Sequence, residues 1–187
     1  PCGDGGMITT DDTELYERIQ PLTWLGITST YSRTQGDNPT GRPGYAWDYD
    51  INVLGVKAYM IDLTAAIGLE QMKKLPDNLA IRRHVQARYN AELGDVLQTP
   101  PHSETVQFYS ARVDADVRDA LIDYLADKRI HTSVHYKPLH HHAITKQDRA
   151  FPVADREWRR LISLPCHAGM TDEDIDYVVY WVREFLA

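Results

Sequence analysis

The sequence predicts an α/β fold, because stretches with helical periodicity alternate along the chain with stretches that alternate like strands. A chain of 187 residues with 43% hydrophobic content is large enough to bury a core. Its longest apolar run is only a few residues, far short of the roughly 20 that a membrane span needs. We therefore expect a soluble protein in which helices cover short strands.

The beginning of the chain predicts a turn, a short strand and a helix. The turn is GDGGM, and residues 7–10 should continue it as a strand. Asp11 and Asp12 can cap a helix that should end before Pro21. Residues 28–50 are rich in Gly, Pro, Ser, Thr and Asn, so we expect a long loop there. It is either a ligand-facing entrance loop or a solvated insertion.

The middle of the chain predicts two helices in series. Residues 62–75 carry apolar side chains on most sides, as in a buried helix, and Pro76 should start a second helix. In the second helix, apolar residues recur every four positions from Ile81 to Leu93. This pattern is typical of a long amphipathic connector.

The last part of the chain predicts a β-α-β unit and a final helix. Residues 105–113 and 129–135 read as strands, and Thr171 with Asp174 forms a capping box before the final helix. The helix between the two strands has Val117, Leu121, Tyr124 and Leu125 as its apolar positions.

Charge and cysteine content exclude several classes of partner. A net charge of -7 without long charged runs argues against binding to nucleic acid or to an anionic membrane surface. Cys2 and Cys166 are far apart and form no C-x-x-C motif, which fits a reducing cytoplasm better than a disulfide framework. Either cysteine could be a buried thiol.

The histidines of HYKPLHHH suggest either a metal site or a substrate-facing loop. Adjacent His141 and His142 point in different directions on any regular element, and no zinc-binding motif accompanies them. A metal-dependent hydrolase built on His135, His140, His141 and His142 stays open as a lesser alternative. We expect no metal and favour the substrate-facing loop.

Two further stretches could bind an anion. The glycines of GDGGM could cradle a phosphate, but they lead into a predicted strand rather than a helix, so no P-loop is formed. Lys57 and Tyr59 stand just ahead of a predicted helix and could reach an anion. The alternative for Lys57 is an ordinary surface lysine.

Taken together, these stretches resemble the DegT/DnrJ/EryC1/StrS family of sugar aminotransferases along nearly the whole chain. Four ordered motifs carry the resemblance. They are the GDGGM turn, the stretch GVKAYMIDLTAAIGLEQM, the stretch VHYKPLH and the stretch SLPCHAGMTDED.

The resemblance implies the C-terminal part of a fold-type I transferase that depends on pyridoxal 5'-phosphate (PLP). Residues 1–75 would end the large cofactor-binding domain, 76–98 would be a connecting helix, and 99–187 would be a small α+β domain. The Schiff-base lysine of the family would fall upstream of Pro1. This chain should therefore lack the catalytic lysine and be inactive alone.

The resemblance also implies a function and its residues. The activity would be transfer of an amino group, usually from glutamate, to a nucleotide-linked keto-sugar by a cytoplasmic homodimer. A noncatalytic regulatory or assembly module of the same fold is the alternative. The implied cofactor-binding residues are Lys57 and Gly5, and the implied substrate-binding residues are His135, Tyr136, Tyr59 and Trp24.

Overall fold

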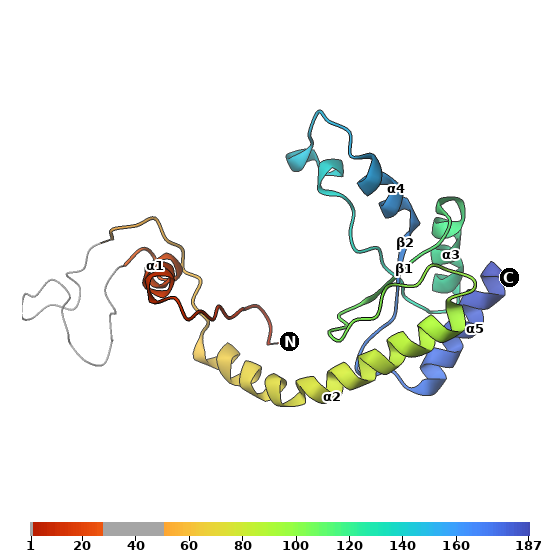
Figure 1. Ribbon diagram of the computed structural model, residues 1–187, viewed down its shortest axis with the longest axis horizontal. Coiled ribbons are helices and arrows are strands. Elements are labelled where there is room, and N and C mark those ends of the chain that lie inside the picture. The colour runs from red at the N-terminus through yellow and green to blue at the C-terminus, as the bar shows by residue number, and fades with distance from the viewer. Residues whose placement is uncertain (1, 28–50) are drawn as a thin grey trace, which may run out of the picture. The chain divides into compact units, whose positions relative to one another are not determined.

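The computed structural model describes residues 2–27 and 51–187, and the chain divides into two compact units. Unit 1 runs from Pro1 to Lys73 and unit 2 from Lys74 to Ala187 (Figure 1). The loop expected over residues 28–50 lies outside the described residues. None of the described helices is both long and apolar enough to cross a membrane.

In unit 1 the first predicted helix forms, but it runs past the proline that should end it. Helix α1 spans Thr13–Thr23, and the Asp12 carboxylate caps it by accepting a hydrogen bond from the Leu15 backbone N–H at 3.0 Å. Pro21 lies inside α1, so the predicted end is wrong. Proline removes only one N–H donor, and the buried Pro21 offers its carbonyl to two backbone N–H groups beyond the helix, at 3.2 and 2.8 Å.

The strand predicted for residues 7–10 is wrong. These residues are exposed and irregular, and no described segment pairs with them. A strand is stable only when a partner satisfies its backbone groups. The pairing that unit 1 does contain joins the chain after α1 to residues 51–58, through bridges from Trp24 to Lys57 and from Ile27 to Ile51.

A single helix, α2, takes the place of the two helices predicted for the middle of the chain. It spans Asp62–Leu93, and Pro76 lies inside it, so the predicted restart at Pro76 is wrong. The helix continues because the proline costs one backbone hydrogen bond, while Met, Lys, Leu and Ala around it are strong helix formers. Within unit 2, Val85, Tyr89 and Leu93 of α2 are fully buried, which confirms the predicted apolar face.

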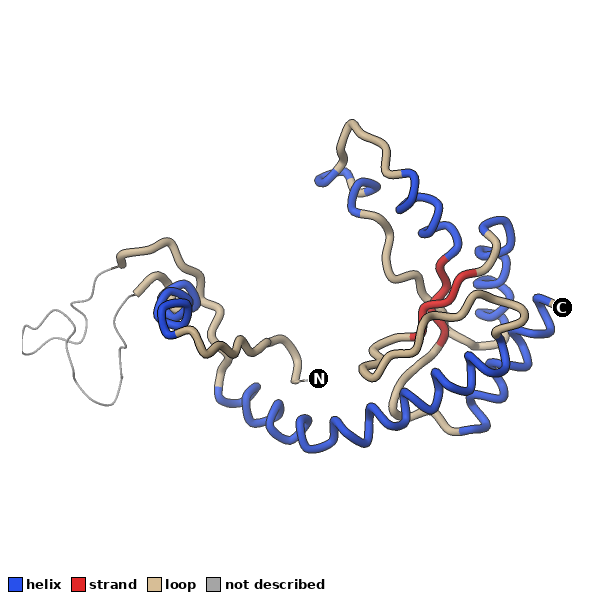
Figure 2. The backbone as a smooth tube through the Cα atoms, in the orientation of Figure 1, coloured by secondary structure: helices blue, strands red, loops and turns tan. Residues whose placement is uncertain are grey.

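Unit 2 contains one small antiparallel sheet (Figure 2). Strand β1, Tyr109–Arg112, pairs with strand β2, Leu161–Leu164. The predicted β-α-β unit is therefore wrong in its second strand, because residues 129–135 meet the sheet through only one bridge, from Ser133 to Ser163. At this bridge Ser133 and Ser163 exchange both of their backbone hydrogen bonds, at 3.1 and 2.7 Å.

Two helices close the core of unit 2 beside the sheet and the second part of α2. Helix α3 spans Ala115–Asp127 and helix α5 spans Asp172–Leu186, and both were predicted from their apolar periodicity. This confirms the two helices. The fully buried large side chains of unit 2 are Tyr89, Tyr109, Leu93, Leu121, Leu125, Ile162, Ile175, Val85 and Val182.

The capping box predicted for the final helix is confirmed. The Thr171 hydroxyl accepts a hydrogen bond from the Asp174 backbone N–H at 3.2 Å, and the Asp174 carboxylate accepts one from the Thr171 N–H at 2.9 Å. The hydrogen bond from the Thr171 backbone N–H lowers the pKa of Asp174, and so does the one that the Thr171 hydroxyl donates to the same carboxylate at 3.1 Å.

Three short elements between α3 and β2 are absent from the sequence predictions. They are the 3-10 helices η1, Leu139–His141, and η2, Ala143–Thr145, and the α-helix α4, Pro152–Arg160. A proline at the first position of α4 is a typical start signal and could have indicated this helix.

Candidate functional site

Three of the residues predicted to bind cofactor or substrate come together in unit 1. Trp24 pairs with Lys57 through a backbone bridge, and the rings of Trp24 and Tyr59 meet edge to face, with centroids 4.5 Å apart. The Lys57 ammonium lies 5.8 Å from the Trp24 ring centroid and 5.6 Å from that of Tyr59. Both rings attract a cation, so they hold the ammonium on the surface. We call these three residues the lysine cluster.

The lysine cluster leaves the charge of Lys57 available. Lys57 is exposed and forms no ion pair with a carboxylate in the part of the chain that the structure describes.

Beside the lysine cluster, the chain after α1 approaches residues 51–58 very closely. A Cβ atom on Gly26 would lie 1.8 Å from the Val53 carbonyl oxygen, and the φ of Gly26 is +83°. Only glycine allows this approach, and so glycine is needed to build the cluster.

Gly5, the other residue predicted to bind the cofactor, lies elsewhere in unit 1. Its φ is +151°, and a Cβ atom there would lie 2.7 Å from the Cε atom of Met60. The space beside Gly5 is thus filled by a side chain of the protein itself. Gly5 serves the close packing of the GDGGM turn, and its contact with a cofactor stays a prediction.

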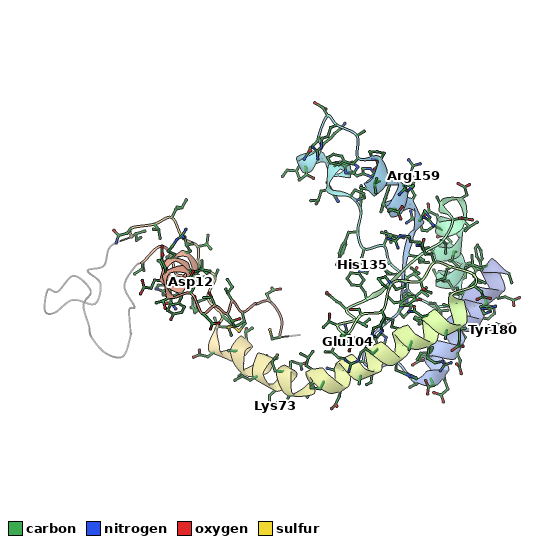
Figure 3. All side chains as sticks on the ribbon, in the orientation of Figure 1. Asp12, Lys73, Glu104, His135, Arg159 and Tyr180 are labelled. Atoms are coloured by element: carbon green, nitrogen blue, oxygen red, sulfur yellow. The ribbon has the colours of Figure 1, made fainter. Side chains whose placement is uncertain are left out.

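In unit 2, His135 (labelled in Figure 3) contacts Ser163 on β2 and Phe108, which stands just before β1. Its Nδ1 atom lies 2.9 Å from the Oγ atom of Ser163, which is buried on β2. Its ring stacks on Phe108, just before β1, with centroids 4.5 Å apart and planes at 20°. The Nε2 atom of His135 has no hydrogen-bond partner among the described residues. The Nδ1 edge of the imidazole is therefore fixed, and Nε2 is available to a ligand.

Tyr136 completes this second group, which we call the histidine platform: Phe108, His135 and Tyr136. The Tyr136 ring meets the His135 ring edge to face at 4.7 Å and the Phe108 ring at 6.3 Å. Tyr136 is 68% exposed. The platform therefore presents a hydroxyl, an imidazole nitrogen and aromatic surface together, a set that suits a sugar or a phosphate.

The three consecutive histidines at 140–142 are not part of the histidine platform. The Nε2 atoms of His140 and His141 lie 2.8 and 2.6 Å from the same carboxylate oxygen of Asp155 on α4, while His142 is exposed. Hydrogen bonds from His140 and then His141 lower the pKa of Asp155. The prediction grouped four histidines by sequence and missed Asp155, because the contact depends on how α4 packs.

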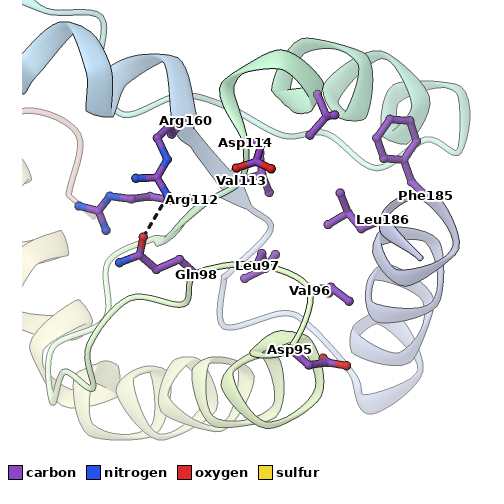
Figure 4. Close-up of a pocket in the computed structure, with 11 residues that line it drawn as sticks. Asp95, Val96, Leu97, Gln98, Arg112, Val113, Asp114, Arg160, Phe185 and Leu186 are labelled. Carbon is purple, nitrogen blue, oxygen red and sulfur yellow. Dashed lines mark hydrogen bonds between the residues drawn. The ribbon is translucent and has the colours of Figure 1, made fainter.

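An open cavity of about 430 Å³ also lies in unit 2, away from the predicted residues (Figure 4). Arg112, Arg160 and Gln98 line one side, and Phe185 and Leu186 line another. The arginines already have partners, since Arg112 donates to Glu157 at 2.8 Å and Arg160 donates to Gln98 at 3.3 Å. The cavity therefore offers little free positive charge for a ligand.

The cysteine of unit 2, Cys166, is partly buried against the core rather than fully buried. Burial raises the pKa of the Cys166 thiol, and the nearby Arg82 opposes this only in part. A thiol with a raised pKa stays protonated near neutral pH and is a poor nucleophile.

Known proteins resemble this chain over almost its full length. The spore coat polysaccharide biosynthesis protein SpsC of Bacillus subtilis is 32% identical, and the match covers 98% of this chain and 50% of that protein. The dTDP-4-dehydro-2,3,6-trideoxy-D-glucose 4-aminotransferase of Saccharopolyspora spinosa is 30% identical over 92% of this chain and 46% of the enzyme. The chain thus spans about half the length of these relatives.

Solved structures agree with the fold. AtS13 from Actinomadura melliaura superposes with a TM-score of 0.80 at 29% identity, covering 98% of this chain and 48% of that one. The PLP form of Spr1654 from Streptococcus pneumoniae superposes with a TM-score of 0.74 at 28% identity, covering 95% and 46%. These matches confirm the predicted partial fold-type I architecture.

The sequence model of one family matches residues 1–183. The matched residues include all four motifs noted in the sequence, the lysine cluster and the histidine platform. The chain belongs to the DegT/DnrJ/EryC1/StrS aminotransferase family.

Proposed function

We propose that this chain is the C-terminal half of a PLP-dependent aminotransferase that acts on a nucleotide-linked keto-sugar, with glutamate as the amino donor. Family membership supports aminotransfer, and the name of the Saccharopolyspora spinosa relative supports a dTDP-linked sugar as the kind of substrate. The complete enzyme is a cytoplasmic homodimer in this proposal. By the complete enzyme we mean this chain preceded by the half that carries the Schiff-base lysine.

The observation that carries the proposal is the histidine platform. The hydrogen bond between Ser163 and Nδ1 and the stacking on Phe108 orient His135. In the tautomer whose Nδ1 accepts from the Ser163 hydroxyl, the free Nε2 carries the proton and can donate to a phosphate or sugar oxygen without first being ordered. The exposed Tyr136 hydroxyl adds a second donor beside it. These groups bind and orient the substrate rather than move its protons.

The residues of the lysine cluster fit a phosphorylated cofactor. Lys57 is an exposed cation without a carboxylate partner in the described residues, and an ammonium on a flexible stem suits a phosphate dianion. In the proposal Lys57 reaches the cofactor of the other subunit, and Trp24 and Tyr59 border the substrate. When bound, PLP supplies the electron sink for amino-group transfer.

In the proposal, each domain expected from the sequence has its own role. Residues 1–75 contribute to the large cofactor-binding domain, 76–98 connect, and 99–187 form the small domain that carries the histidine platform. The noncatalytic module of the same fold remains the rival, and the experiment below separates the two.

The test compares the complete enzyme with the 187-residue chain alone. Each protein is incubated with PLP, glutamate and a dTDP-linked 4-keto-sugar, and mass spectrometry measures the amino-sugar product and 2-oxoglutarate. We expect product only from the complete enzyme. If the complete enzyme binds PLP and forms neither product nor 2-oxoglutarate, the noncatalytic module is the better description. Formation of 2-oxoglutarate alone would reject this sugar while keeping the amino-donor half-reaction.

A further inference from the structure

The side chains of His140, His141 and Asp155 converge in unit 2 from two separate elements. His140 and His141 lie in η1, and Asp155 lies in α4. One nitrogen from each imidazole and one oxygen of the carboxylate all lie within 4.8 Å of one another. We call these three residues the His-Asp cluster.

Aromatic contacts hold both imidazoles in this arrangement. The ring of His140 stacks on Phe151 with centroids 4.5 Å apart and planes at 26°. The ring of His141 meets Trp158 edge to face at 4.8 Å. The side chain of His140 is only 14% exposed and that of His141 27% exposed, so the two rings have little freedom to turn away.

The donor set is suited to a particular class of ion. Two imidazole nitrogens and one carboxylate oxygen favour a borderline transition metal such as Zn²⁺ over Mg²⁺ or Ca²⁺, which prefer oxygen ligands. Around a tetrahedral zinc ion the ligand atoms would stand roughly 3.4 Å apart. The present separations of 2.8 and 2.6 Å from the nitrogens to the Asp155 oxygen therefore need only small side-chain shifts.

We propose that His140, His141 and Asp155 form a binding site for a divalent transition-metal ion, with Zn²⁺ as the ion and water completing its coordination. Each neutral imidazole then carries its proton on Nδ1 and offers Nε2 to the ion. The ion replaces two hydrogen bonds to Asp155 and joins η1 to α4. Its role is to stabilise this part of unit 2, and it takes no part in aminotransfer.

The sequence supplies matched controls. His142 follows the cluster directly in the HHH run but is exposed, and Asp148 is an exposed carboxylate between the cluster's two segments. If the geometry of the His-Asp cluster creates the site, loss of His141 should weaken metal binding and loss of His142 should not. If a histidine-rich surface binds the metal without a defined site, the two losses should have the same effect.

The experiment uses the 187-residue chain after chelator treatment, with ZnCl₂ alone as the probe. Calorimetric titration should give one site, and His141→Ala and Asp155→Asn should each weaken binding by roughly tenfold or more, because one of three protein ligands is lost. His142→Ala and Asp148→Asn should keep the parent affinity. Zinc should also raise the melting temperature of the parent and of both controls, but not that of the cluster variants.

A second probe keeps the test informative if a cluster variant folds poorly. Co²⁺ bound at a site with nitrogen ligands absorbs visible light, and His141→Ala should lose this band while His142→Ala retains it. Circular dichroism of the metal-free variants reports whether each is folded. The proposal is overturned if parent and cluster variants bind Zn²⁺ equally, or if His142→Ala weakens binding as much as His141→Ala. Because no PLP or sugar is present, this outcome is independent of the proposed aminotransferase function.

Discussion

The Nδ1 atom of His135 lies 2.9 Å from the Oγ atom of Ser163. Ser163 stands opposite Ser110 in the register of β1 and β2, and the two serine hydroxyls are also 2.9 Å apart. A line of three polar side chains therefore runs from the sheet to the imidazole. The strand pairing of unit 2 thus decides how His135 is oriented.

Replacement of His135 by Ala should raise the Michaelis constant of the complete enzyme for its sugar nucleotide. The loss of one polar or charge-assisted hydrogen bond is worth roughly 1 to 3 kcal/mol, or about 5- to 150-fold. The amino-donor half-reaction with glutamate should change little, and separate half-reaction kinetics check this. His142→Ala is the control. An equal fall of both half-reactions, or an unfolded variant, would show that His135 is structural.

Replacement of Ser163 by Ala should also raise the Michaelis constant for the sugar nucleotide, but by less than His135→Ala. The hydroxyl orients the imidazole without touching the substrate, so its effect should vanish once the imidazole is gone. The double variant His135→Ala, Ser163→Ala should therefore have the same Michaelis constant as His135→Ala alone. Additive effects in this cycle would contradict a positioning role for Ser163.

Replacement of Lys57 by Ala should weaken PLP retention and leave the fold intact. The variant loses the exposed ammonium that Trp24 and Tyr59 flank, and no other contact of the core. Cofactor release during dialysis of the complete enzyme, followed by absorbance, measures the effect. Lys73→Ala is the control, because Lys73 is exposed on α2 and pairs with Glu70. Equal retention by parent and Lys57→Ala would rule out the phosphate contact.

Replacement of Leu125 by Ala should lower the free energy of unfolding by about 2 to 5 kcal/mol, because Leu125 is fully buried in the core of unit 2. Urea denaturation followed by circular dichroism gives this value. Ile144→Ala is the control, since Ile144 is 95% exposed and its change should stay within about 0.5 kcal/mol. Similar losses in both variants would mean that α3 does not close the core.

Replacement of Asp174 by Asn should make the stability of the chain less sensitive to acid. The hydrogen bonds from Thr171 lower the pKa of Asp174 in the folded state, so this carboxylate stabilises the fold above its unfolded pKa of about 3.9. That contribution is lost as the pH falls through the lower folded pKa. Melting temperatures measured from pH 7 downward should fall less steeply below about pH 4 for the variant. Parallel curves for parent and variant would contradict the assignment.

The sequence by itself determined the family and the features that depend on neighbouring residues. Four motifs in order identified the resemblance that the family match confirms. The Asp12 cap and the Thr171 and Asp174 capping box were predictable because each links groups only three residues apart. Apolar periodicity likewise predicted α3 and α5, since a helix face repeats within a few positions.

Only the tertiary structure decided which distant segments meet. It paired β1 with β2 rather than with residues 129–135, and so placed Ser163 against His135. It brought Asp155 to His140 and His141, and Trp24 to Lys57. Each of these contacts joins residues that are far apart in the chain, where local propensity carries no information. In unit 2 the packing of α4 and of the sheet selects these contacts, and in unit 1 the pairing of the chain after α1 with residues 51–58 selects them. In each unit, burial of apolar surface and satisfaction of backbone hydrogen bonds stabilise the arrangement.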